Sequence, residues 1–167
     1  MYDELTKEDI KKMKEELDYR TRVLRPQLID DVKVARGFGD LSENFEYKAA
    51  KREKNRNDSR VRYLERMIKT AKVISDSSAS DVAGLYDKVT IRAEDDNSER
   101  VITLVTTLRQ NAPQGLISKE SPVGKAVIGH KAGERVYIKL SEDDGYWLDI
   151  LKIEKGSDDG SIPIRGY

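Results

Sequence analysis

The first half of the chain carries apolar residues at the spacing of a coiled coil. Within residues 10–35 they recur mostly every three, four or seven positions, and within residues 47–71 the spacing alternates between three and four. This heptad pattern predicts two long helices. The turn at residues 37–39, which contains two glycines, is short enough to make the helices antiparallel neighbours. Residues 1–74 are therefore predicted to form an antiparallel coiled-coil domain.

Local signals add detail to this hairpin. Thr6 followed by Asp9 is close to a capping box and predicts the start of the first helix. Pro26 lies inside the apolar pattern and predicts a kink or a local interruption. Lys54 and Asn57 occupy seam positions of the second helix, so we expect looser or hydrated packing beside them.

The second half of the chain changes to a period of two after a short polar linker at residues 75–83. Strands are predicted at residues 88–92, 101–108, 115–118, 135–140 and 146–153, and a brief helix at residues 122–128. Together these elements predict an α+β fold in which residues 84–155 form an antiparallel sheet with one short helix. Residues 156–167, rich in Gly, Ser and Asp, are predicted to form a flexible tail.

Composition narrows the classes of function. The 167 residues include no cysteine and one histidine, and 37% of them are charged. These numbers exclude a disulfide framework, a cysteine zinc site and a thiolate nucleophile, and they disfavour a Ser-His-Asp triad. No apolar run approaches the roughly 20 residues that span a bilayer, and the acidic N-terminus does not predict a signal peptide. We therefore expect a cytoplasmic protein with no membrane contact.

The net charge of zero hides an asymmetry between the two halves. Residues 1–74 hold 19 Lys and Arg against 15 Asp and Glu, whereas residues 75–167 hold 12 against 16. A basic half and an acidic half predict different partners for the two domains.

The turn between the predicted helices is the most unusual part of the sequence. The second helix is expected to begin near residues 40–43, where Asp40 and Glu43 have the spacing of a capping box, which is the simpler interpretation. The same spacing lets two carboxylates approach one cation from the same side. Mg²⁺ uses one or two protein carboxylates and takes its other ligands from water and phosphate. The alternative is an acidic tip at residues 37–46 that completes a metal site of another molecule.

A basic run follows this turn. It comprises Lys48, Lys51, Arg52, Lys54, Arg56, Arg60 and Arg62. Lys51 and Arg52 lie three and four residues after Lys48, so the three share a helix face. A solvated helix face is the simpler interpretation. The alternative is a stripe that follows the phosphates of a single nucleic-acid strand leading to the tip.

Together these stretches resemble the bacterial transcript cleavage factors of the GreA/GreB family, and are closer to its GreA members. The matching stretches are the tip motif Gly39–Lys51 and the C-terminal signature Ile117–Ala126 with Ile128-Gly129. Further matches upstream are Leu5–Glu8, Glu15–Leu17 and Arg25-Pro26. The resemblance covers residues 5 to about 154. It implies an N-terminal coiled coil and a C-terminal domain similar to FKBP-type isomerases.

The resemblance also implies a function. In this family the C-terminal domain docks on bacterial RNA polymerase, and the coiled coil enters the secondary channel of the polymerase. The tip acids, here Asp40 and Glu43, then help the polymerase hold Mg²⁺ and hydrolyse backtracked RNA near its 3′ end. A factor of this kind, which we expect to be a monomer, is no nuclease alone and binds no Mg²⁺ stably alone.

Two further groups of residues follow from the resemblance. The expected contacts to the 3′ end of backtracked RNA are Lys48, Lys51, Arg52, Lys54 and Arg56. The expected polymerase contacts are Ser118, Ser121, Pro122 and Gly124.

Three alternatives remain at this point. The first is a channel-binding homologue that inhibits polymerase without promoting cleavage; the presence of both Asp40 and Glu43 argues against it. The second is a prolyl isomerase with a coiled-coil handle, which the absence of Phe from the C-terminal domain disfavours. The third is a structural coiled-coil adaptor, for which the two tip acids would serve only as helix caps.

Overall fold

The computed structural model describes residues 2–39 and 43–166. It divides into two compact units, one made chiefly of residues 10–71 and the other of residues 3–9 and 72–166. None of the helices in these described ranges is long and apolar enough to cross a membrane.

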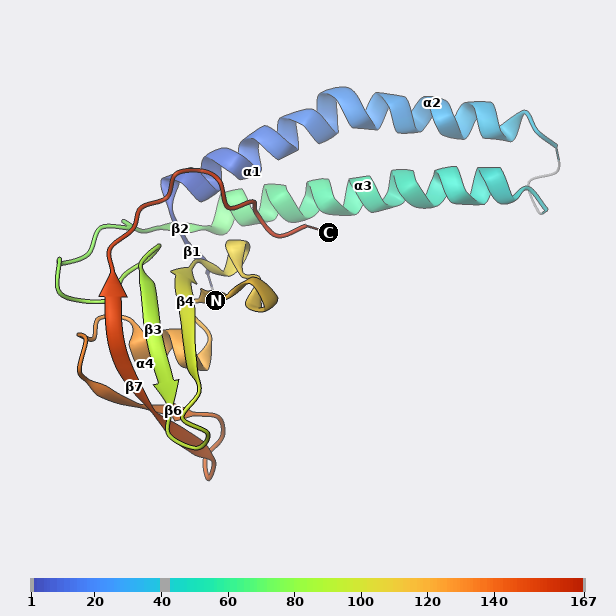
Figure 1. The fold of residues 1–167 in the computed structure, drawn as a ribbon. Helices are drawn as coiled ribbons and strands as arrows, with labels where there is room; N and C mark the ends of the chain where they lie inside the picture. Colours follow the sequence, from blue (N-terminus) through green and yellow to red (C-terminus); the bar gives the residue numbers. More distant parts are fainter. Residues whose placement is uncertain (1, 40–42, 167) are drawn as a thin grey trace. The chain divides into compact units, whose positions relative to one another are not determined.

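The first unit is a helical hairpin. Its first arm comprises α1 (Lys7–Tyr19), a π-helical segment η1 (Arg20–Leu24) and α2 (Arg25–Arg36), and its second arm is α3 (Phe45–Thr70). Figure 1 shows α2 and α3 running side by side as the two arms. The long helices predicted from the heptad pattern are present, and the buried apolar positions of α3 are Val61, Leu64 and Met67.

The irregularity predicted at Pro26 is a π turn. The Arg25 N–H donates to the carbonyl of Arg20, five residues earlier, and Pro26 follows directly in the first turn of α2. Proline has no N–H to donate and its ring crowds the preceding turn. A single wide turn accommodates this defect without ending the helical arm.

The predicted start of α1 is confirmed by two reciprocal hydrogen bonds. The Thr6 N–H donates to Asp9 Oδ2 at 3.0 Å, and the Asp9 N–H donates to Thr6 Oγ1 at 3.2 Å. This is a capping box with Asp in the position that Glu or Gln usually occupies. Just before it, β1 (Glu4–Leu5) pairs in parallel with β2 (Lys72–Val73), a two-residue ladder too short for the alternation of the sequence to predict.

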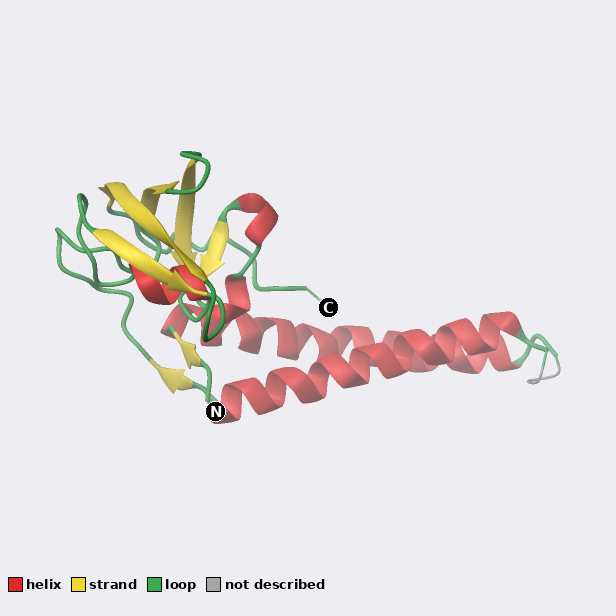
Figure 2. Ribbon diagram, turned by 90° about the horizontal axis from the view of Figure 1, so that it is seen from below, coloured by secondary structure: helices red, strands yellow, loops and turns green. Residues whose placement is uncertain are grey.

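The second unit contains a five-stranded sheet, shown with its strands in yellow in Figure 2. Its order is β5-β4-β3-β7-β6, with β3 (Lys88–Ala93), β4 (Glu99–Val105), β5 (Leu116–Ser118), β6 (Arg135–Lys139) and β7 (Gly145–Glu154). The α+β class is confirmed. The sheet is mixed and not purely antiparallel as predicted, because β5 joins β4 in parallel. Residues 107 and 108, predicted as the end of a strand, belong to a 3₁₀ turn at Thr107–Arg109.

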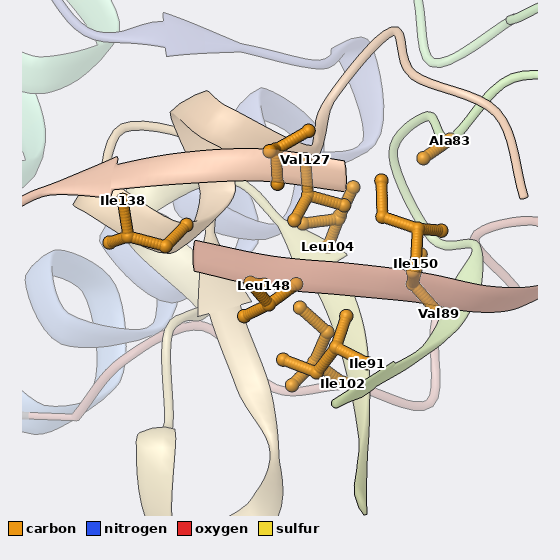
Figure 3. Packing of buried hydrophobic residues seen from close by; sticks show 10 residues of the cluster. Ala83, Val89, Ile91, Ile102, Leu104, Val127, Ile138, Leu148 and Ile150 are labelled. Atoms are coloured by element: carbon orange, nitrogen blue, oxygen red, sulfur yellow. The ribbon is translucent and has the colours of Figure 1, made fainter. Parts of the chain in front are cut away.

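One face of the sheet carries the hydrophobic core (Figure 3). Val89 and Ile91 from β3 meet Leu148 and Ile150 from β7, and Val127 from α4 (Pro122–Val127) is fully buried against them. The period-two alternation of these strands places alternate residues on this face. Burial of the core fixes the strand register, since a shift by one residue would expose every member.

The predicted tail makes specific contacts with the rest of the second unit. The side chain of Asp158 is 4% exposed and pairs with Arg109 at 2.6 Å, and Arg109 also donates to the carbonyl of Ile162. The Arg165 N–H donates to the carbonyl of Leu108. Residues 158–165 therefore lie against this unit at several points.

Candidate functional site at the tip of the helical hairpin

Asn44 connects the two arms of the hairpin. Its side-chain Oδ1 accepts the Tyr47 N–H at 3.0 Å and so caps α3, while its Nδ2 donates to the carbonyl of Ala35 near the end of α2 at 2.6 Å. The second helix therefore begins at Phe45, later than the predicted start near residues 40–43. A residue that caps one helix and donates to the other fixes the spacing of the arms at this end.

The placement of Asn44 bears on both tip carboxylates. Glu43 precedes the cap, is exposed, and forms no ion pair within the described ranges. It does not occupy the third helical position that a capping box would give it. Asp40 lies outside the described residues. The cap that the sequence assigned to the acidic pair is thus supplied by Asn44, and the Glu43 carboxylate faces solvent.

Exposed aromatic side chains surround Glu43. Phe38 and Phe45 are 65% and 81% exposed, and with Glu43, Asn44 and Glu46 they line an open hollow of about 590 Å³. Large apolar side chains normally lie inside a protein. Two exposed phenylalanines beside a carboxylate therefore indicate a surface that contacts a partner.

Cations lie next to two aromatic rings at the start of α3, those of Phe45 and Tyr47. Lys48 Nζ is 5.7 Å from the centroid of Phe45, and Lys51 Nζ is 5.9 Å from that of Tyr47. Arg36 at the end of α2 lies 5.6 Å from the same Tyr47 ring, and its hydrogen bond to the phenol lowers the pKa of Tyr47. These distances are those of cation–π contacts.

The predicted RNA-contacting residues differ in their surroundings. Lys48, Lys51, Arg52 and Arg56 are exposed. Lys54 is half-buried and pairs with Asp58 at 3.0 Å. Four of the five cations therefore remain at the surface, whereas Lys54 is partly committed to the fold.

A polar layer inside the hairpin, formed by Glu16, Arg20, Asn57 and Arg60, contains one cation of the basic run. Arg60 is buried and donates from Nε and Nη2 to both oxygens of Glu16, at 2.8 and 3.0 Å. Asn57, also buried, accepts from Arg20 Nη1 and donates to the Arg20 carbonyl. The hydrated packing expected around Asn57 is thus replaced by direct side-chain pairing. The layer links α3 to the first arm beside its π turn.

Electrostatics in this layer favour ionised Glu16. Burial raises the pKa of the Glu16 carboxyl, but hydrogen bonds and charge from Arg60 and Arg20 outweigh burial, so the pKa is lowered overall. The ion pair between Glu16 and Arg60 can therefore remain inside the coiled coil.

The predicted docking residues form the turn between β5 and α4. Ser121 Oγ donates to the Ser118 carbonyl at 2.7 Å and accepts the Gly124 N–H at 3.0 Å, which caps α4. Ser118 and Gly124 are buried, and a Cβ on Gly124 would lie 2.0 Å from the Ser118 carbonyl oxygen. Pro122 is the exposed member of the four. Ser118, Ser121 and Gly124 form the hydrogen-bonded turn that contains Pro122.

No group of three or more Asp, Glu or His side chains that could hold a metal occurs among the residues described. A shared Mg²⁺ site involving Asp40 and Glu43 remains a prediction.

Sequence reasoning missed Asn44, although an Asn directly before a helix is itself a cap signal. The two phenylalanines that flank the tip acids, Phe38 and Phe45, were also given no chemical role from the sequence.

The chain thus has the architecture of a two-domain factor. The first domain is an antiparallel helical hairpin with a charged, aromatic tip, and the second is a small mixed-sheet domain. Family models match both parts: "Transcription elongation factor, N-terminal" over residues 4–73 and "Transcription elongation factor, GreA/GreB, C-term" over residues 78–155. The chain belongs to the GreA/GreB family of transcription elongation factors.

Curated relatives agree with this assignment. Transcription elongation factor GreA of Oenococcus oeni is 39% identical over 152 residues, covering 90% of this chain and 94% of its own. GreA of Bacillus subtilis is 39% identical over 135 residues, covering 81% and 86%. Among solved structures, GreA factor homolog 1 of Thermus thermophilus is 22% identical with a TM-score of 0.43, covering 93% of this chain and 100% of that one.

Proposed function

We propose that this elongation factor stimulates RNA polymerase to hydrolyse its own backtracked RNA. In this proposal the hairpin enters the secondary channel of the polymerase, and Asp40 and Glu43 help to hold a Mg²⁺ ion in the active centre. The factor supplies two carboxylates and the polymerase supplies the remaining ligands. Hydrolysis near the RNA 3′ end creates a new terminus from which an arrested complex resumes synthesis.

The observation that carries the proposal is the free carboxylate of Glu43. Asn44 already caps α3 and binds the end of α2, so the fold does not need Glu43 at this position. A carboxylate that is exposed at the end of a helical hairpin is available to a cation bound elsewhere. Mg²⁺ takes one or two such ligands and completes its shell with water and phosphate oxygens.

The chemistry assigned to the metal is that of a two-metal phosphodiester site. Bound Mg²⁺ would activate water and stabilise the charge that develops on the leaving oxygen. The residues of this chain position the metal and the RNA. Asp40 and Glu43 would provide oxygen ligands to Mg²⁺. Lys51 and Arg52, on the exposed face of α3, would hold RNA phosphates. Pro122, exposed at the start of α4, lies on the proposed docking surface for polymerase.

The test is RNA cleavage in a stalled, backtracked bacterial polymerase complex with Mg²⁺. Wild-type protein should shorten the RNA, and the Asp40→Ala/Glu43→Ala variant should lose this effect while it still binds polymerase. The matched control is Asp30→Ala/Asp31→Ala, which removes two exposed carboxylates from α2 and should cleave normally. The protein without polymerase should leave the RNA intact.

Other outcomes would replace the proposal. Loss of polymerase binding in the tip variant would contradict the division between a docking domain and a reactive tip. Suppressed elongation without cleavage by the wild type would identify an inhibitory channel binder. No effect on cleavage or elongation would favour a structural adaptor.

A further inference from the structure

The ring of Phe45 is exposed, and the proposed metal chemistry does not use it. It occupies the first position of α3, directly after the capping Asn44, and is 81% exposed. Phe38, which lines the same hollow, is 65% exposed. Removing apolar surface from water is favourable, so a ring left this open gains free energy when a flat partner covers it.

The surroundings of Phe45 indicate what kind of partner fits. Lys48 lies 5.7 Å from its centroid, and Arg36 and Lys51 flank the next ring, Tyr47. Aromatic faces interleaved with exposed cations are the pattern by which proteins hold single-stranded nucleic acid: the rings stack on bases and the cations hold phosphates. An apolar protein partner would gain nothing from three cations beside the rings.

We infer that Phe45 stacks on the base of the extruded nucleotide at the 3′ end of backtracked RNA. This inference rests on the proposed function, because backtracking is what would bring an unpaired RNA end to the tip. Phe45 is then a positioning residue. It would hold the terminal nucleotide so that the phosphodiester bond to be cleaved stays beside the carboxylate of Glu43, two positions earlier in the chain.

Stacking makes a specific demand on the RNA. Every base has a π face, so Phe45 should accept all four bases, and an abasic terminal nucleotide should lose the contact entirely. The expected variants follow the same chemistry. Phe45→Leu keeps apolar bulk without a ring, and Phe45→Trp keeps a ring. The side chain is so exposed that neither change should alter folding, which circular dichroism would verify.

The first measurement is the cleavage rate at saturating factor on two backtracked complexes that differ only in the terminal nucleotide, normal or abasic. On normal RNA, Phe45→Leu should be slower than wild type by at least about fivefold and Phe45→Trp should remain within about twofold. On abasic RNA, wild type should fall to the Phe45→Leu rate. Tyr19→Leu, which removes another exposed aromatic ring from the first arm, should match wild type on both.

The second measurement does not depend on cleavage. A 4-thiouridine at the RNA 3′ end is photo-crosslinked in the polymerase complex without Mg²⁺, and the modified residue is mapped. The crosslink should fall on Phe45, persist in Phe45→Trp and in Glu43→Ala, and disappear in Phe45→Leu.

The two measurements separate the two ideas. A crosslink at residue 45 without any cleavage would support stacking and defeat the proposed function. Cleavage with an equal loss from Phe45→Leu on normal and abasic RNA would overturn stacking and indicate contact of the ring with polymerase. A crosslink unaffected by Phe45→Leu would overturn it as well.

Discussion

The Arg109 Nε donates to Asp9 Oδ1 at 2.7 Å, although the two residues are 100 positions apart in the chain. Both side chains are fully buried. Asp9 uses its other oxygen to accept the Thr6 N–H and the Thr106 hydroxyl, and Arg109 turns its remaining nitrogens to Asp158 and the Ile162 carbonyl. The guanidinium thus joins the N-terminal segment, the 3₁₀ turn and the C-terminal residues of the second unit.

Asp158→Asn should destabilise the second unit because it removes one of two carboxylates that neutralise a buried guanidinium. Breaking a buried pair from one side costs about 3 kcal/mol, since the remaining charge stays without full compensation. Urea unfolding with tryptophan fluorescence, which reports Trp147 on β7, measures the loss. Asp159→Asn is the matched control, because this neighbour is exposed and contacts Ser161. Equal stability of the two variants would show that Asp158 does not support Arg109.

Much of this fold was accessible from the sequence, for reasons visible in its elements. The heptad seam predicted the helices, the Thr6–Asp9 box predicted the start of α1, and period-two alternation predicted the strands of the sheet. Each of these signals involves residues close together in the chain, so it can be recognised from the sequence alone. The π turn could be placed at Pro26 but its type could not be predicted, because a missing N–H can be accommodated in several ways.

The remainder depends on contacts between distant segments. Nothing near Arg109 indicates that its partners are residues 9 and 158, and nothing in a Gly- and Asp-rich C-terminus indicates that it packs. At the tip, two overlapping cap signals competed, the Asp40–Glu43 spacing and Asn44. The helix uses Asn44 because its amide also reaches the Ala35 carbonyl on the other arm. A pattern within one helix does not contain that second contact.

The Glu16 carboxylate should make hairpin stability depend on pH. Its pKa lies below the ordinary value of 4.5 because Arg60 and Arg20 outweigh burial. A lowered folded-state pKa contributes stability above the unfolded pKa, and this stability is lost as pH falls through the folded pKa. Glu16→Gln should therefore cost about 2 kcal/mol at pH 7, and the gap should narrow below about pH 4.5.

Thermal unfolding followed at 222 nm between pH 3 and 7 measures this gap. Glu15→Gln, an exposed neighbour on the same helix, provides the control and should differ little from wild type at any pH. A gap that stays constant down to pH 3 would show that the Glu16 carboxylate does not contribute through its charge.

The two hydrogen bonds of Asn44 can be separated by substitution. Asn44→Ala loses both and should destabilise the hairpin by about 1 kcal/mol or more. Asn44→Asp keeps the oxygen that caps α3 but loses the donor to Ala35. Amide hydrogen exchange should therefore show Tyr47 protected in Asn44→Asp and unprotected in Asn44→Ala. Equal protection in both would mean that the cap does not govern the start of α3.

Gly124 should be intolerant of any side chain. A Cβ there would lie 2.0 Å from the Ser118 carbonyl, and overpacking of this kind costs about 3 kcal/mol. Gly129→Ala is the matched control: its φ of +81° makes Ala unfavourable by about 1 kcal/mol, but no atom crowds the added methyl. Denaturant unfolding of both should rank Gly124→Ala as the more severe, and the reverse order would contradict the crowding argument.

Charge reversal on the exposed face of α3 should weaken cleavage without weakening the fold. Lys51→Glu/Arg52→Glu removes two cations beside the tip, both exposed and neither part of the Glu16–Arg60 layer. Each phosphate contact on a single strand contributes a slope of about −0.7 in log affinity against log salt. The double variant should therefore lose cleavage of RNA backtracked by several nucleotides, and its remaining activity should depend less on salt. Lys11→Glu/Lys14→Glu makes the same charge change on exposed positions of α1 and should keep both the rate and the salt slope of the wild type. If both double variants lose activity equally, the effect comes from the overall charge of the hairpin, and the assignment of an RNA-binding face to α3 is wrong.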